Sequence, residues 1–272
     1  MSEIKLFSSH APQEGYPIQE LGMYSDGTPL VKQKIPSHVD SIVVQPHTFH
    51  SFVTAMFLVD SLNEQDYWIK NLILPYVPGA RQDRINPTGD ILFTMKSVAR
   101  MINDRNFSRV VVLDPHSSVA PALINRCSIF PLANVAKKMW QGYGGVIAPD
   151  AGASKRAEEV AAVLGVNVTQ ASKHRDVSTG RLSGFEVKVT PGVHYLVVDD
   201  ICDGGGTFVG LGEKIKAQGA FADLYVTHPI FSKGTSVLKE YYKNIFTTDS
   251  RYPTNMSGLN TLRVVYEMME LS

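Results

Sequence analysis

The chain has little cysteine and no excess of charge of either sign. Its 272 residues include two cysteines, Cys127 and Cys202, which are too few for a disulfide framework. Lysine plus arginine number 26 and aspartate plus glutamate also number 26, so no global charge favours nucleic acid or an acidic membrane. We therefore expect no nucleic-acid partner, and any anion site must be local.

Long apolar runs are lacking as well. No stretch approaches the roughly 18 apolar residues that a membrane helix needs, and the opening MSEIKLFSSH has no signal-peptide core. We therefore expect a cytoplasmic protein with no membrane partner. The Walker pattern GxxxxGK[ST] is absent too, which argues against the chemistry of P-loop kinases.

Short apolar runs alternate with helix-like segments along the chain. Runs that end at polar residues or proline predict strands at 41–46, 71–76, 109–115, 145–150, 195–200 and 224–229. Between them, helices are expected at 51–62, 90–102, 154–165 and 208–220. This alternation predicts an α/β protein with mainly parallel sheets flanked by helices, and ligands bound beyond the carboxyl ends of the strands.

The most informative segment is 196–210, LVVDDICDGGGTFVG. An apolar strand ends in Asp199 and Asp200, and Asp203 then precedes three glycines. Those glycines, Gly204, Gly205 and Gly206, free successive backbone N–H groups to face an anion at a helix start, next to Thr207. The three carboxylates repel one another unless a metal, a lysine or sugar hydroxyls offset their charge. The simpler alternative is a strand-to-helix turn with capping residues.

This segment resembles the phosphoribosyl-diphosphate signature of the type I phosphoribosyltransferase fold. Four further segments resemble ribose-phosphate pyrophosphokinases and follow in that family's order: LPYVPGARQDR (74–84), VVLDPHSS (111–118), VIAPDAGASKRA (146–157) and ASKHR (171–175). The resemblance implies two tandem phosphoribosyltransferase-like domains. We place them at 1–135, an ATP platform, and 136–272, which carries the sugar-phosphate loop. The break is expected near 131–144, and the last residues are expected to pack back on the first domain.

The resemblance implies transfer of the β,γ-diphosphate of Mg-ATP to the 1-hydroxyl of ribose 5-phosphate, giving phosphoribosyl diphosphate and AMP. Such a transfer needs in-line positioning and neutralisation of spread negative charge. Lys173 and Arg175 are the expected catalytic residues, because they lie on a polar, glycine-containing segment that can fold over the transferring group. The alternative for this pair is a solvated basic loop.

Further roles are implied by the same resemblance. ATP is expected to contact Arg81, Gln82, Asp83, His116 and Asp26. Mg²⁺, the expected cofactor, is assigned to His116 beside Asp114, and to Asp150. The sugar phosphate is assigned to Asp199, Asp200, Asp203, Gly204, Gly205, Gly206 and Thr207.

Structural alternatives exist for several of these residues. Asp83 and Arg84 could form a surface salt bridge, and His116 could be a core histidine. Asp150 could cap a helix that begins near Ser154. Cys202 is expected to serve packing and not nucleophilic chemistry, since no basic residue adjoins it.

The sequence also departs from the family pattern. Two extra glycines in the loop open space that suits a bulkier 5-substituent, so ADP-ribose, an acceptor used by some phage relatives, is an alternative to ribose 5-phosphate. Thr28 replaces a glutamate in YSDGT (24–28), which leaves adenine recognition there open. We expect a homo-oligomer, at least a dimer. The remaining alternatives are a phosphoribosyltransferase and a catalytically silent regulatory homologue.

Overall fold

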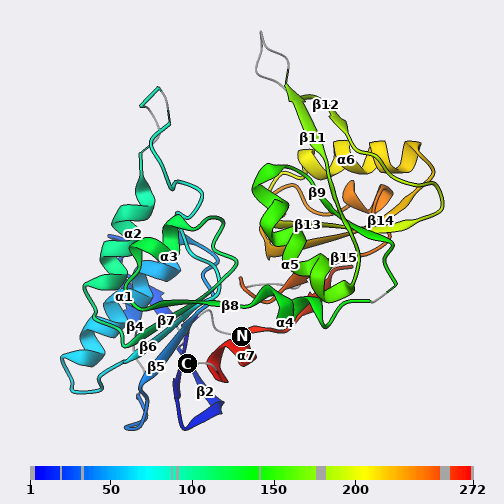
Figure 1. Cartoon of the computed structure of the whole chain (residues 1–272). Coiled ribbons are helices and arrows are strands. Elements are labelled where there is room, and N and C mark those ends of the chain that lie inside the picture. Colours follow the sequence, from blue (N-terminus) through cyan, green and yellow to red (C-terminus); the bar gives the residue numbers. More distant parts are fainter. Residues whose placement is uncertain are drawn as a thin grey trace. The chain divides into compact units, whose positions relative to one another are not determined.

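The structure is a computed structural model. It describes residues 4–18, 20–31, 34–86, 88–89, 92–140, 142–175, 182–251 and 258–270, without side chains at 11–14, 20–22, 173–175 and 182–183. The chain divides into two compact units (Figure 1). Unit 1 comprises Met1–Phe130, Ser250–Pro253 and Arg263–Ser272, and unit 2 comprises Pro131–Asp249 and Thr254–Leu262. Because Ser250–Pro253 and Arg263–Ser272 belong to unit 1, the chain returns to that unit at its C-terminal end.

Unit 1 is built on a six-stranded sheet of order β2-β1-β5-β6-β7-β8. Its strands are β1 (Ile4–Ser8), β2 (Ala11–Ile18), β5 (Ser41–Val44), β6 (Asn71–Leu74), β7 (Arg109–Leu113) and β8 (Cys127–Phe130). Strands β5 to β8 run parallel, whereas β1 is antiparallel to both β2 and β5. The middle strands are almost wholly buried, as expected for a parallel sheet with both faces covered.

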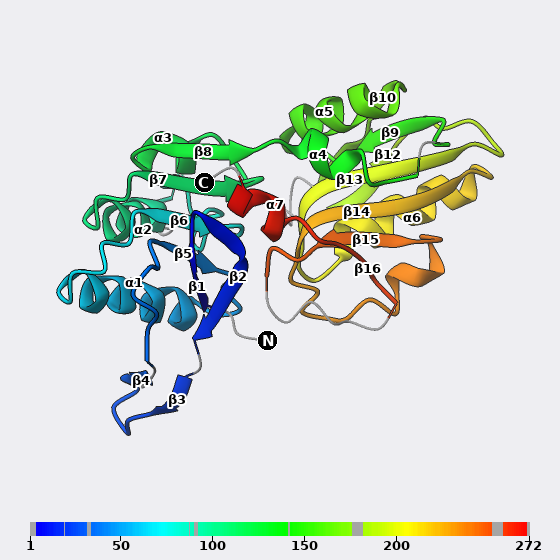
Figure 2. The ribbon, with the colours of Figure 1, turned by 90° about the horizontal axis from the view of Figure 1, so that it is seen from below.

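The helices of unit 1 are α1 (Phe49–Asn63), α2 (Thr94–Asn103), α3 (Val119–Leu123) and α7 (Val265–Glu270). Thr48 caps α1, because its hydroxyl accepts a hydrogen bond from the Ser51 N–H at 3.3 Å. Residues of α1 and α2 pack into the same hydrophobic core, and α7 packs against β2 and β6. A small hairpin, β3 (Glu20–Met23) and β4 (Pro29–Val31), completes the unit (Figure 2).

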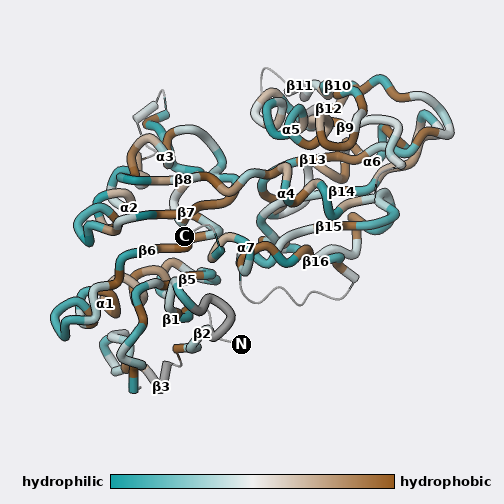
Figure 3. Tube along the Cα trace, turned by 60° about the horizontal axis from the view of Figure 1, so that its bottom comes forward, coloured by the Kyte–Doolittle hydropathy of each residue, from teal (hydrophilic) through white to brown (hydrophobic). Residues whose placement is uncertain are grey.

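Unit 2 is built on an all-parallel sheet of order β10-β9-β13-β14-β15-β16. Its strands are β9 (Gly145–Ala148), β10 (Val168–Gln170), β13 (His194–Cys202), β14 (Phe221–Pro229), β15 (Ile245–Thr248) and β16 (Asn260–Leu262). Its helices are α4 (Leu132–Ala136), α5 (Ser154–Leu164) and α6 (Gly206–Ala217), with short 3-10 turns η1 (Ala151–Ala153) and η2 (Leu238–Glu240). The hydrophobic stretches of the chain lie largely along the strands of the two sheets (Figure 3).

A second hairpin, β11 (Ser172–Arg175) and β12 (Leu182–Glu186), lies against α6. Its anchor is Phe185, whose ring lies so close to Gly210 that a Cβ there would be 2.8 Å from it. The predicted α/β class with mainly parallel sheets is confirmed. No helix in the described parts of the chain has the length and apolarity needed to cross a bilayer.

Candidate active site

The centre of the candidate site is the carboxyl end of β13 in unit 2. Strand β13 pairs with β9 on one side and β14 on the other, and its residues 195–198 are buried. The chain then leaves the sheet through Asp203 and enters α6 at Gly206. The predicted strand, loop and helix are therefore in place, at the edge where parallel sheets bind ligands.

Glycine is required in this loop at Gly205. Its φ of +77° lies in the left-handed region, and its carbonyl oxygen accepts from the N–H groups of Phe208 and Val209, each at 3.0 Å. No atom lies within 4 Å of where a Cβ on Gly206 would be. Because the first N–H groups of a helix lack intrahelical acceptors, the start of α6 offers backbone donors in open space.

The acid pair before the loop is held by an arginine. Arg156 Nη1 donates to Asp199 Oδ1 at 3.3 Å, and Arg156 Nη2 lies 3.7 Å from Asp200 Oδ2. Arg156 lies in the first turn of α5, and its side chain is only 8% exposed. The negative charge of the acid pair is thus offset in part by an arginine, whereas the sequence led us to expect a metal, a lysine or sugar hydroxyls. The sequence alone assigned no role to Arg156.

This cluster perturbs the protonation of Asp199. Burial, and next the Asp200 carboxylate, raise the pKa of Asp199 to about 8, and these effects outweigh the lowering by Arg156. The Asp200 N–H also donates to Asp199 Oδ1 at 2.9 Å. The pair therefore resists carrying two negative charges, and a cation or a hydroxyl donor would stabilise its ionised form.

Asp150 belongs to the same edge of unit 2. It follows β9, the parallel neighbour of β13, and its Oδ1 accepts from the Ala153 N–H at 3.3 Å. The capping alternative for Asp150 is confirmed, although the capped element is η1, which immediately precedes α5 at Ser154. Its assignment as a metal ligand stays a prediction.

Cys202 is buried, and burial raises the pKa of its thiol to about 12. A Cβ on Gly205 would lie 3.9 Å from its sulfur, so the thiol packs beneath the loop. A thiol this reluctant to ionise is a poor nucleophile, which agrees with the packing role expected for it.

In unit 1 the segments ARQDR and DPH lie at one edge of the sheet. The first follows β6 and the second follows β7, and these strands are parallel neighbours. Asp83 is buried, and a hydrogen bond from Arg84, followed by one from Ser117, lowers the pKa of Asp83 against the opposing effect of burial. His116 adds a further electrostatic contribution in the same direction. The structure therefore brings Asp83 and His116 together.

The alternatives for these unit 1 residues can now be decided in part. Arg84 Nε lies 2.8 Å from Asp83 Oδ1, so the salt bridge given as the alternative for these two residues exists, although its carboxylate is buried. His116 is exposed, which rules out a core histidine. Its φ is +59° and that of Asp114 is +40°, and such strained non-glycine backbone is concentrated at functional sites. Arg81 and Gln82 are exposed at the same edge.

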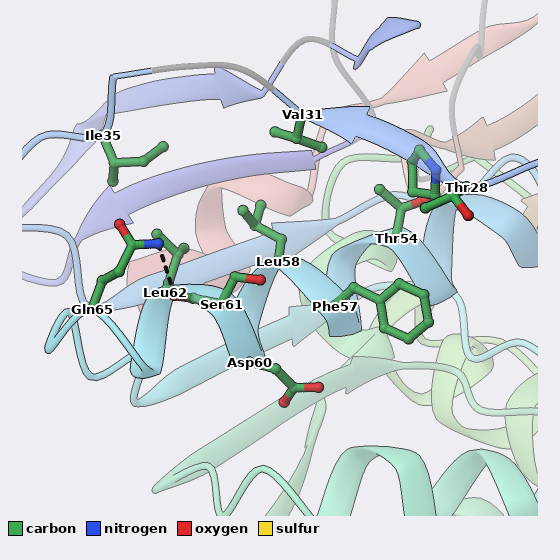
Figure 4. Close-up of a pocket in the computed structure, with 11 residues that line it drawn as sticks. Thr28, Val31, Ile35, Thr54, Phe57, Leu58, Asp60, Ser61, Leu62 and Gln65 are labelled. Carbon is green, nitrogen blue, oxygen red and sulfur yellow. Dashed lines mark hydrogen bonds between the residues drawn. The ribbon is translucent and has the colours of Figure 1, made fainter. Parts of the chain in front are cut away.

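Asp26 lies in the turn between β3 and β4. Its Oδ1 accepts from the Thr28 N–H at 2.9 Å, and this bond lowers the pKa of Asp26. Thr28 borders a pocket of about 560 Å³ between this hairpin and α1 (Figure 4). The pocket is lined by Thr28, Pro29, Val31, Ile35, Thr54, Phe57, Leu58, Asp60, Ser61, Leu62 and Gln65.

Lys173 and Arg175 lie in β11, where the backbone of Lys173 pairs with that of Phe185. Their side chains, and residues 176–181, fall outside the described parts of the chain. The predicted catalytic segment is thus located by its backbone, on a hairpin anchored to the helix that begins at the glycine loop.

The assignment of Asp150 and His116 to Mg²⁺ can be compared with the ligands that this ion prefers. Within the described residues, no three His, Cys, Asp or Glu side chains converge as ligands for one metal ion. Mg²⁺ commonly uses one or two carboxylates together with substrate phosphates and waters, so a single carboxylate such as Asp150 suits it. The imidazole of His116 suits it less well, because Mg²⁺ prefers oxygen.

Known proteins match this chain over most of their own length. No family model matches the sequence. The ribose-phosphate pyrophosphokinase of Pyrococcus abyssi is 27% identical over 264 residues, covering 92% of this chain and 90% of the relative. That of Methanopyrus kandleri is 29% identical and covers 86% and 84% of the two chains.

A solved structure agrees at the level of the fold. The crystal structure of phosphoribosylpyrophosphate synthetase from Mycobacterium smegmatis matches with a TM-score of 0.76 at 20% identity, covering 92% of this chain and 87% of that one. This likeness confirms the two-part phosphoribosyltransferase-type fold. The relatives that match over nearly their full length are ribose-phosphate pyrophosphokinases, and this chain is similar to that family of transferases in sequence and in fold.

Proposed function

We propose that this protein transfers the β,γ-diphosphate of ATP to the 1-hydroxyl of ribose 5-phosphate, giving phosphoribosyl diphosphate and AMP. The observation that carries the proposal is the Asp199–Asp200 pair, placed directly before a glycine loop that opens α6. In the reaction the 1-oxygen forms a bond to the β-phosphorus. The bond from that phosphorus to the α,β-bridging oxygen breaks, AMP leaves, and the hydroxyl proton passes to solvent.

In unit 2, the loop residues Asp203 to Thr207 would hold the 5-phosphate through backbone N–H groups. The partial positive charge at the start of α6 favours an anion there. Asp199 and Asp200 would accept hydrogen bonds from the 2- and 3-hydroxyls of the ribose. Arg156 would act as a positioning residue, since its guanidinium contacts both carboxylates.

In unit 1, Arg81, Gln82 and His116 would contact ATP, because all three are exposed at the edge where ligands bind. Asp83 is buried and bonded to Arg84, so it would act by positioning that edge. Asp26 would contribute from its hairpin, where its carboxylate is already oriented by the Thr28 N–H.

The cofactor we propose is Mg²⁺, held chiefly by ATP phosphates. The protein ligands assigned to it are the Asp150 carboxylate of unit 2 and the His116 imidazole of unit 1. When bound, it would neutralise charge on the diphosphate being transferred. Lys173 and Arg175 would clamp the transferring group, and their contacts would be strongest in the transition state.

A second acceptor class is favoured by one observation. The space beside Gly206 is open and Gly204 is exposed, so the loop could admit a ribose whose 5-position carries a diphosphate ester, such as ADP-ribose. The chemistry at the 1-hydroxyl would be the same.

The test is AMP release from Mg-ATP by the purified protein with ribose 5-phosphate, with ADP-ribose and with no acceptor. AMP formed with ribose 5-phosphate supports the proposal, and AMP formed chiefly with ADP-ribose supports the second acceptor. AMP with neither acceptor, or at the same rate without one, would overturn both. Asp200→Asn is the matched variant, because it should lower acceptor-dependent release while changing the KM for ATP little.

A further inference from the structure

The chain that follows β14 runs beside the glycine loop. Cys202 pairs with Pro229 at the ends of the parallel strands β13 and β14, and the two segments stay joined beyond the sheet. The Phe231 N–H donates to the Cys202 carbonyl at 2.8 Å, and the Ser232 N–H donates to the Asp203 carbonyl at 3.1 Å. This backbone pairing brings the following residue, Lys233, to the loop.

Lys233 lies along Gly204. A Cβ on Gly204 would be 3.7 Å from Lys233 Cε and 3.8 Å from its Cδ, so the end of the lysine side chain reaches the loop that would receive the 5-phosphate. A tight turn fixes this placement: Phe231 is buried with a φ of +42°, and the Gly234 N–H donates to its carbonyl at 2.8 Å. Lys233 itself is exposed and open to a ligand.

The negative charges around the loop favour a cation at this position. A phosphate monoester carries about −1.5 to −2 charges near pH 7, whereas a helix start supplies only about +0.5. Asp199, Asp200 and Asp203 add negative charge nearby, and Arg156 is engaged by the first two of them. The backbone donors of α6 alone therefore leave a bound phosphate under-neutralised.

We propose that Lys233 is a specificity-determining residue, which binds the anionic 5-substituent of the acceptor. It makes a phosphorylated 5-position the requirement for tight binding. This inference rests on the proposed function, because it takes the loop to be the 5-phosphate site. Nothing in the sequence motifs signals it, since Lys233 lies well beyond the carboxylate loop.

The experiment compares Lys233→Met, which keeps an apolar side chain of similar length, with Lys233→Arg, which keeps the charge. Lys214→Met is the control, because Lys214 is an exposed lysine in the last turn of α6, at the end of the helix away from the loop. Steady-state AMP release gives kcat and the KM values for ribose 5-phosphate and ATP. Calorimetric titration with ribose 5-phosphate, and separately with unphosphorylated ribose, gives binding without turnover.

For Lys233→Met we expect the KM and Kd for ribose 5-phosphate to rise on the order of tenfold, as for loss of one charge-assisted contact. The kcat, the KM for ATP and the binding of ribose should change little, and Lys233→Arg should restore most of the affinity. Lys214→Met should behave like the parent protein.

Unchanged affinity in Lys233→Met, or equal losses for ribose and ribose 5-phosphate, would overturn the role of Lys233. A parent protein that releases no AMP, yet binds ribose 5-phosphate in a Lys233-dependent way, would overturn the proposed reaction and retain the site. A parent protein that binds no ribose 5-phosphate in the calorimeter would overturn both.

Discussion

Replacing Asp199 by asparagine should stabilise unit 2 at alkaline pH while weakening acceptor binding. The Asp199 side chain is 15% exposed and lies beside Asp200, and its pKa is raised from 3.8 to about 8. The folded chain therefore keeps a proton on Asp199 that the unfolded chain releases at much lower pH. Asparagine cannot ionise, so the variant lacks this titration.

The sign and size of the effect follow from linkage. A raised folded-state pKa gives stability that is fully present below pH 3.8 and is lost as the pH rises through about 8. Each pKa unit corresponds to about 1.4 kcal/mol, and the folded state holds nearly one extra proton over most of the interval from pH 5 to pH 8. Relative to Asp199→Asn, the parent protein should lose roughly 3 kcal/mol of unfolding free energy across that interval.

The assay is denaturant unfolding at pH 5 and pH 8. Trp140 reports on unit 2, because its ring packs against Tyr143 at 4.9 Å between centroids. A Trp68→Phe background removes the fluorescence of the tryptophan in unit 1. Glu158→Gln is the control, since it removes an exposed carboxylate from α5 in the same unit.

The stability difference between Asp199→Asn and its parent should grow from pH 5 to pH 8, while the difference for Glu158→Gln stays constant. A difference of equal size at both pH values would refute the burial argument. A variant that keeps the parent KM for ribose 5-phosphate would remove Asp199 from the acceptor site.

Three further outcomes are expected. Lys173→Ala should lower kcat by roughly 100-fold or more with little change in ATP affinity, because its contact would form in the transition state; equal losses in kcat and in the measured Kd for ATP would contradict that role. Arg156→Met should cost about 3–5 kcal/mol of unfolding free energy at pH 8, because it leaves the buried Asp200 carboxylate and the partly buried Asp199 beside it without their cation; an unchanged denaturation midpoint would contradict it. Gly205→Ala should cost about 1–2 kcal/mol, because its φ is +77°, and should raise the KM for the acceptor; parent-like values for both would show that the loop tolerates a Cβ.

Much of the fold can be predicted from the sequence, because parallel strands that are buried on both faces consist of continuous apolar residues. The expected strands at 145–150, 195–200 and 224–229 correspond to β9, β13 and β14. The strand β15 (Ile245–Thr248) escapes this approach, since Thr247 and Thr248 are buried although polar. A helix was expected over 90–102, and α2 begins at Thr94; residues 90 and 91 lie outside the described parts of the chain.

The antiparallel strands and the packing of the C-terminal helix α7 were harder to predict. The β1–β2 pair and the β11–β12 hairpin lack the apolar runs that identify the parallel strands. The last residues were expected to pack back on the first domain, but local pattern cannot specify that the partners of α7 are β2 and β6.

The sequence predicted those residues of the candidate site that lie in one continuous segment. It did not predict the residues that only the fold brings to the site. The loop from Asp199 to Thr207 is contiguous, so its composition reveals it. Arg156 and Lys233 reach the same edge from α5 and from the turn after β14, and only the sheet order brings them there. Asp83 is similar, because its burial depends on the packing of unit 1.

The most direct test of the central claim is the stoichiometry of the products from Mg-ATP and ribose 5-phosphate, read by phosphorus NMR and by mass. The account predicts AMP and a diphosphate on the sugar 1-oxygen in equal amounts. In a parallel reaction with ADP-ribose in place of ribose 5-phosphate, a product with diphosphates at both the 1- and the 5-position should form faster only if ADP-ribose is the better acceptor. ADP as the nucleotide product would mean transfer of a single phosphoryl group, and it would contradict the assignment of the Asp199–Thr207 loop to a pyrophosphokinase acceptor site.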